Sequence, residues 1–140
     1  MTKVAKLLVG ILLILYYREA HGQPLIEDNN IYSAAAIKTK PAYPGGIEKF
    51  TEYLESNFKF SPEALKANLS GKLILSFVIE KDGSLSTFNV IKDIGFDTGK
   101  EALRLLEGSR KWIPASQNGE RVRVRFIMPI MLNAGGDFHI

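Results

Sequence analysis

Few residues of this sequence have the types and the spacing that catalysis or metal binding requires. The two histidines, His21 and His139, stand far apart, and neither belongs to a pair with metal-ligand spacing. The chain has no cysteine, which excludes a thiolate nucleophile and cysteine-ligated metal sites. Asp93 and Asp97 could form a carboxylate pair, but carboxylates this close in sequence are too common to indicate catalysis. We therefore predict a protein that is not an enzyme and has no cofactor or metal site.

A second pattern is the alternation of arginine with apolar residues in RVRVRFIMPI, Arg121 to Ile130. With a period of two, Arg121, Arg123 and Arg125 share one face of a strand. The opposite face carries the apolar residues Val122, Val124, Phe126, Met128 and Ile130. The arginines could bind nucleic acid, form the solvated face of a sheet, or border an edge that another protein uses.

Binding to nucleic acid is the weakest of these three interpretations. Such a face would interleave basic and exposed aromatic side chains, whereas Phe126 falls on the apolar face. The formal charge of +3 includes Lys3, Lys6 and Arg18, with only Glu19 against them. Without residues 1–22 the chain would carry a charge of only about +1. We predict no nucleic-acid partner.

The first 22 residues have the pattern of an export signal. Lys3 and Lys6 precede an 11-residue apolar run from Leu7 to Tyr17, and the small residues Ala20 and Gly22 suit a cleavage site before Gln23. A membrane-spanning helix needs about 20 apolar residues, so this run is short for a permanent anchor. We predict that residues 1–22 are a signal peptide, with a short retained anchor as the alternative.

The remaining chain divides into a flexible tether at 23–40, one domain at 41–132 and a C-terminal tail at 133–140. The domain opens with a Pro-Gly-Gly turn and shows the order helix, helix, strand, strand, helix, strand. This order predicts an α+β domain, in which helices pack on one face of a small antiparallel three-stranded sheet.

Local signals support this order of elements. Ser61 and Pro62 suit the first positions of a short helix. The pairs Asp82-Gly83 and Asn118-Gly119 are typical of tight turns, the first of them between the strands of a hairpin. Trp112, the single tryptophan, is expected to be at least partly buried against the sheet.

These motifs, taken in order, resemble the C-terminal domain of TonB-family energy transducers. The resemblance covers roughly Pro41 to Leu132 and is carried by the following segments, quoted in chain order: YPGG, SPEAL, GKLILSFVIEKDGSLSTFNVI and EALRLLEGSRKWIPASQNGERVRVRFIMPI. The Pro-Gly-Gly opening is similar to the variant of the family common in Bacteroidota.

The resemblance implies a location, partners and a binding site. Members of the family work in the periplasm and carry force from the inner-membrane ExbB–ExbD complex to outer-membrane transporters. The TonB box of the transporter adds to the domain as an extra strand. The matching residues here, which we expect to bind the partner, are Arg121, Val122, Arg123, Val124, Arg125, Phe126, Ile127 and Met128. A homodimer is also possible in such a domain.

The same fold could serve an alternative role. A full transducer has a membrane anchor and a long spacer, whereas residues 23–40 would reach only roughly 60 Å when fully extended. The alternative is an anchorless periplasmic adaptor, or a sensing or assembly module, that binds another peptide or envelope partner.

Overall fold

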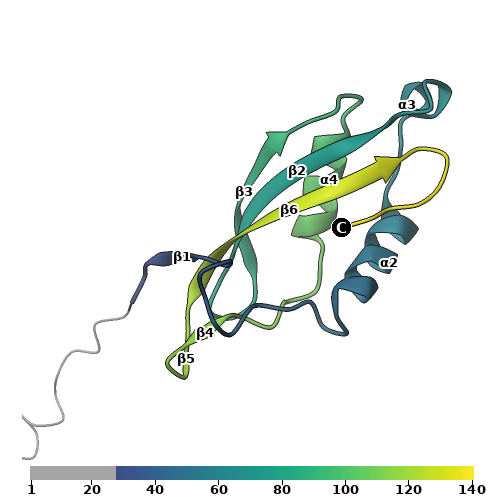
Figure 1. Cartoon of the computed structure of the whole chain (residues 1–140). Helices are drawn as coiled ribbons and strands as arrows, with labels where there is room; N and C mark the ends of the chain where they lie inside the picture. The colour runs from purple at the N-terminus through teal and green to yellow at the C-terminus, as the bar shows by residue number, and fades with distance from the viewer. Residues whose placement is uncertain (1–27) are drawn as a thin grey trace, which may run out of the picture.

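The computed structural model describes residues 28–140, which form a sheet covered by helices on one face (Figure 1). The helices are α2 (Ile47–Asn57), α3 (Pro62–Lys66) and α4 (Thr98–Glu107). The strands are β1 (Ile31–Ser33), β2 (Ser70–Ile79), β3 (Leu85–Lys92), β4 (Ser116–Gln117), β5 (Glu120–Arg121) and β6 (Arg123–Asn133). The predicted α+β class is confirmed.

Four strands form the main sheet in the order β1-β6-β2-β3, and β4 and β5 form a separate hairpin. The strands β2 and β6 pair antiparallel without interruption, from Ser70 opposite Asn133 to Ile79 opposite Val124. β3 is antiparallel to β2, whereas β1 lies parallel to the first residues of β6. The prediction of three antiparallel strands therefore missed one parallel strand, because the three residues of β1 are too few to show a period.

The core lies between the sheet and the helices. Apolar side chains alternate along β2 and β6, so that every second residue faces Phe50 and Leu54 of α2 and Leu105 and Leu106 of α4. The predicted apolar face of the arginine-containing strand is confirmed, because Val122, Val124, Phe126, Met128 and Ile130 all belong to this core or pack against it.

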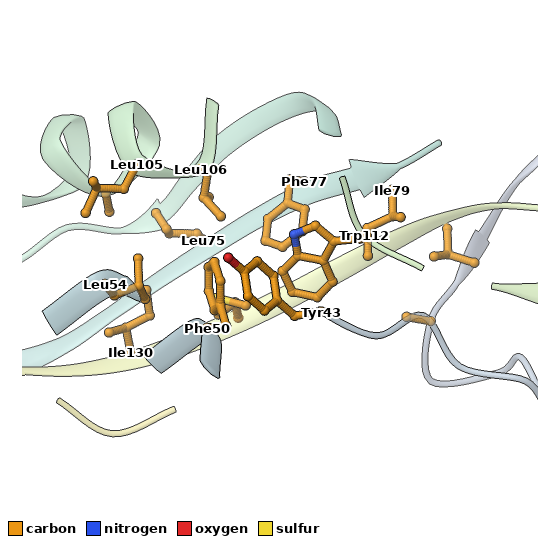
Figure 2. Close-up of a cluster of buried hydrophobic side chains, with 14 of the residues drawn as sticks. Tyr43, Phe50, Leu54, Leu75, Phe77, Ile79, Leu105, Leu106, Trp112 and Ile130 are labelled. Carbon is orange, nitrogen blue, oxygen red and sulfur yellow. The ribbon is translucent and has the colours of Figure 1, made fainter. Parts of the chain in front are cut away.

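An aromatic cluster occupies one end of the core (Figure 2). The ring of Trp112 lies 5.6 Å from Tyr43, 5.2 Å from Phe50 and 5.6 Å from Phe77, measured between centroids. Its edge-to-face contacts with these rings are the arrangement that aromatic pairs prefer. Trp112 is only 4% exposed, which confirms the prediction of its burial.

The predicted turns and helix start are also confirmed. Gly83 and Gly119 have φ angles of +85° and +81°, and Asn118 has a φ angle of +51°. The Asp82 carboxylate accepts hydrogen bonds from the backbone N–H and the hydroxyl of Ser84. These two hydrogen bonds are the main reason that the pKa of Asp82 is lowered to about 2. Ser61 caps α3, since its Oγ accepts a hydrogen bond from Ala64 at 3.1 Å.

The two domain boundaries expected from the sequence are corrected by the structure. Residues 23–40 were predicted to be a tether, but residues 31–33 form β1, and Ala34 and Ile37 are buried in the core. Residues 133–140 were predicted to be a tail, but Phe138 is 5% exposed and His139 pairs with Met131. The described parts of these segments, residues 28–40 and 133–140, are short and aperiodic, so that only their contacts with distant residues show that they belong to the domain.

The predicted signal peptide, residues 1–22, lies outside the described residues. Within residues 28–140, no helix has the length and apolar character needed to cross a membrane.

Candidate functional site

The eight residues predicted to bind a partner do not lie on one strand. Arg121 belongs to β5, where it pairs with Ser116 across the small hairpin. Val122 is buried and donates its backbone N–H to Ala115 at 3.0 Å, which continues the hairpin pairing. β6 begins only at Arg123. The structure therefore groups Arg123 to Met128 along strand β6 and places Arg121 and Val122 at the separate β4–β5 hairpin.

The three arginines have different surroundings. The guanidinium of Arg123 donates two hydrogen bonds to Glu80, from Nε at 2.7 Å and from Nη2 at 3.1 Å. These hydrogen bonds are the main reason that the pKa of Glu80 is lowered, and a hydrogen bond from the Ser86 hydroxyl lowers it further by a smaller amount. Within residues 28–140 the exposed side chain of Arg125 has no such partner. Arg125 is therefore available to an incoming partner, whereas Arg123 is held by the sheet.

The backbone of β6 defines the outer edge of the sheet. The C=O group of Arg125 accepts a hydrogen bond from Ala34, and Met131 exchanges two hydrogen bonds with His139. Both residues therefore direct their backbone groups away from β2. Because backbone groups alternate sides along a strand, Ile127 and Pro129, which lie between them, direct theirs outward as well.

A short part of this outer edge is unoccupied. Within residues 28–140, no backbone group pairs with the outward N–H and C=O groups of Ile127 or with the outward C=O group of Pro129. Pro129 has no N–H to donate, which shortens the edge available to a further strand. The free edge thus offers one donor and two acceptors beside an Ile127 side chain that is 59% exposed.

The rest of the predicted edge is covered by strand β1 of the same chain. Ile31, Tyr32 and Ser33 lie opposite Arg123, Val124 and Arg125 in parallel register. This pairing could not be predicted from the sequence, because β1 consists of only three residues. Part of the edge expected to bind a partner is therefore occupied within the chain itself.

Two hollows lie where β1 meets the free edge. One, of about 280 Å³, is lined by Ser33, Ala34, Ala35, Lys40, Arg125, Phe126 and Ile127. The other, of about 290 Å³, is lined by Ile31, Tyr32, Ser33, Arg125 and Ile127. Each is large enough for one or two side chains of an added strand.

The opposite edge of the sheet, strand β3, is less regular. Its pairing with β2 contains two register shifts, and Thr87 has a φ angle of +50°. Such irregularities bend a strand and interrupt the even row of backbone groups that a further strand needs. The part of β6 that β1 leaves uncovered is therefore a better platform for strand addition than β3.

The carboxylate pair considered from the sequence has a local structural role. Asp93 Oδ1 accepts hydrogen bonds from the backbone of Ile94 and Gly95 and from the hydroxyl of Thr98. This carboxylate therefore fixes the turn that leads into α4. Among residues 28–140, no group of three or more histidine, aspartate or glutamate side chains could hold a metal ion.

Comparison with known families identifies the domain. A family model described as Gram-negative bacterial TonB protein C-terminal matches residues 56–133, which is more than half of the chain. The chain belongs to the TonB C-terminal family. No curated protein and no solved structure gave a match.

Membership of the TonB C-terminal family gives this domain a general role. The family is a transport-associated, non-enzymatic domain on the periplasmic side of Gram-negative bacteria, and it engages outer-membrane receptors. The matched residues run from the end of α2 to the end of β6 and include the candidate edge. β1 lies before the matched region, so the strand that covers part of the edge is not part of the family match.

Proposed function

We propose that this TonB C-terminal domain binds the TonB box of an outer-membrane transporter as an extra strand along the outer edge of β6. The observation that carries the proposal is the regular 11-residue strand β6, whose outward backbone groups at Ile127 and Pro129 are unpaired within residues 28–140. Backbone hydrogen bonds would supply most of the affinity, as they do wherever a peptide extends a sheet.

Side chains beside the edge would select the partner. The exposed guanidinium of Arg125 suits an acidic residue of the added strand. The hollows at Ile127 suit small or medium apolar side chains. Of the residues predicted from the sequence, those from Arg123 to Met128 would contact the partner directly, and Arg121 and Val122 would position the start of β6 through their hairpin.

We also propose that the chain is exported to the periplasm by residues 1–22. The first residue of the mature protein separates two modes of action. A mature chain that begins at Gln23 would act as an anchorless adaptor in the periplasm. A chain that retains Leu7 to Tyr17 in the inner membrane could couple to ExbB–ExbD and transduce force. Mass spectrometry of the protein isolated from cells measures this directly.

The docking proposal is tested by NMR titration of residues 23–140 with TonB-box peptides from receptors of the source organism. We expect backbone shifts that centre on Ile127 and extend along β6. An absence of shifts in residues 123–130 at millimolar peptide would contradict the assignment.

Two variants locate the contact. Ile127→Pro removes one outward N–H and leaves the donors of the β2–β6 ladder in place, so peptide affinity should fall about three- to tenfold. Arg125→Glu should weaken binding of a peptide that carries an acidic residue, whereas Arg110→Glu, an equal charge reversal on an exposed residue after α4, should not. Equal losses for the two charge reversals would indicate a general effect of charge.

A further inference from the structure

We propose that β1 pairs reversibly with the β6 edge. It covers the docking site until a partner strand replaces it. The identity of that partner rests on the proposed function. The occupation itself is a property of this chain, since Ile31 to Ser33 pair with the same backbone that an added strand would use. A strand that pairs with Arg123 and Arg125 cannot do so while β1 remains in place.

The contacts that hold β1 are few. It forms three residue pairs with β6, Ile31 is 41% exposed, and Ser33 is also exposed. The hydroxyl of Tyr32 donates to Asp28 at 2.6 Å, but this bond lies within the segment and can leave with it. Outside the ladder, Arg123 donates from Nη1 to the C=O group of Asn29 at 3.0 Å. A strand of this length is easily displaced from the edge of a sheet.

The residues that follow β1 are held much more firmly. Ala34 is buried, and Ile37 is 3% exposed within the core. Lys40 Nζ donates to the C=O groups of Ala34 and Ala35, both at 2.9 Å. The N–H of Ala34 donates to the C=O group of Arg125, so residues 28–34 have to leave the edge together. The buried Ile37 keeps the chain that follows in place, so exchange exposes Ala34 but leaves the core around Ile37 closed.

The free edge next to β1 gives an incoming strand a place to begin. The outward groups of Ile127 and Pro129 lie one step beyond the last β1 pair, that of Ser33 with Arg125. The two hollows at this point are lined by residues of both β1 and β6. A partner strand that first pairs at Ile127 can extend toward Arg123 as β1 is released, and each hydrogen bond lost is replaced by a new one.

A reversible covalent lock tests the exchange. Ser33 and Arg125 are partners in the parallel register, and both are exposed. The chain contains no cysteine, so the double variant Ser33→Cys and Arg125→Cys can form only one intramolecular disulfide. The oxidised form keeps β1 in place, and the reduced form allows it to leave. The same protein thus serves as its own control.

The first probe is a synthetic peptide of residues 28–36 of this chain, which carries the strand that the edge already accepts. We expect it to bind the reduced variant at least about tenfold more tightly than the oxidised variant, because binding requires the open edge. In the cysteine-free chain, Tyr32→Ala removes packing against the core and should strengthen binding of the peptide. Lys38→Ala alters an exposed side chain outside β1 and outside both hollows and should leave binding unchanged.

Equal affinity in the two redox forms would overturn the proposal. It would also be overturned if the peptide failed to bind the reduced variant and the Tyr32→Ala chain. The failures of the two proposals are distinguishable with a TonB-box peptide as a second probe. If that peptide binds both redox forms equally, the docking function stands and the exchange is wrong. If only the peptide of residues 28–36 binds, and only to the reduced form, the exchange stands and the assigned partner is wrong.

Discussion

The guanidinium of Arg123 and the carboxylate of Glu80 form a two-point ion pair between the start of β6 and the residue after β2, with the shorter contact at 2.7 Å. The same guanidinium also donates to Asn29, in the segment that leads into β1. One side chain thus joins three parts of the chain. An arginine that the sequence placed among the partner-binding residues therefore helps to hold the internal strand.

This ion pair predicts a pH dependence of stability. Because Arg123 lowers the pKa of Glu80 in the folded state, the contribution of Glu80 is fully present above its unfolded value of 4.5 and is lost as the pH falls through the lower folded value. Glu80→Gln should therefore reduce the change in the free energy of unfolding between about pH 6 and pH 3. Urea denaturation, followed by Trp112 fluorescence at a series of pH values, measures this change.

A double-mutant cycle provides the control for the ion pair. Arg123→Gln should flatten the same acid limb, and the double variant should add little, because either single change already removes the interaction. If the effects of the two single variants simply add, the two residues act independently and the explanation is wrong.

The turn between β2 and β3 predicts a strong intolerance of side chains at Gly83. The C=O group of Gly83 accepts a hydrogen bond from Trp112 at 2.8 Å, and a Cβ atom at Gly83 would lie 1.9 Å from the backbone oxygen of Trp112. Gly83→Ala should destabilise the domain by about 2–4 kcal/mol. Gly119→Ala is the matched control, since Gly119 has a similar φ angle of +81° but an added Cβ atom would have no neighbour within 4 Å. This variant should cost about 1 kcal/mol. Equal costs in chemical denaturation would rule out the contact with Trp112 as the cause.

The C-terminal segment should contribute to stability although the sequence resembles a tail. Phe138 packs against Phe58 at 5.3 Å and Phe60 at 6.0 Å between ring centroids, and its N–H donates to Glu55. Phe138→Ala should cost about 3 kcal/mol, as for other buried aromatic residues. Ile140→Ala, two residues later and exposed, should cost less than about 0.5 kcal/mol. A thermal denaturation midpoint unchanged by Phe138→Ala would show that this segment does not belong to the core.

Pro129 should limit self-association through the β6 edge. It lies on the outward side of the strand, where a residue with an N–H could pair with a second copy of the chain. Pro129→Thr should raise the fraction of dimer at a given concentration, measured by sedimentation velocity. Adding Ile127→Pro to this variant should return the protein toward the monomer. A dimer that persists in the double variant would indicate association through another surface.

Local signals were sufficient for most of the fold. The alternation of apolar residues in β2 and β6, the Asp82-Gly83 turn and the Ser61 cap each depend on neighbours within a few residues. The physical causes are equally local: side chains of a strand alternate faces, glycine tolerates positive φ, and a serine hydroxyl reaches the next turn. The apolar face of the arginine-containing strand could be predicted for the same reason.

The amino-acid sequence was enough to predict an α+β domain of the TonB C-terminal type and the side chains of β6 that face the core. Which part of the β6 edge is free depends on segments far away in the sequence, so it could be seen only in the folded domain. Ile31 to Ser33 cover its start, and His139 pairs with Met131 further along. Backbone groups are the same in every residue except proline, so pairing along an edge leaves almost no trace in the sequence.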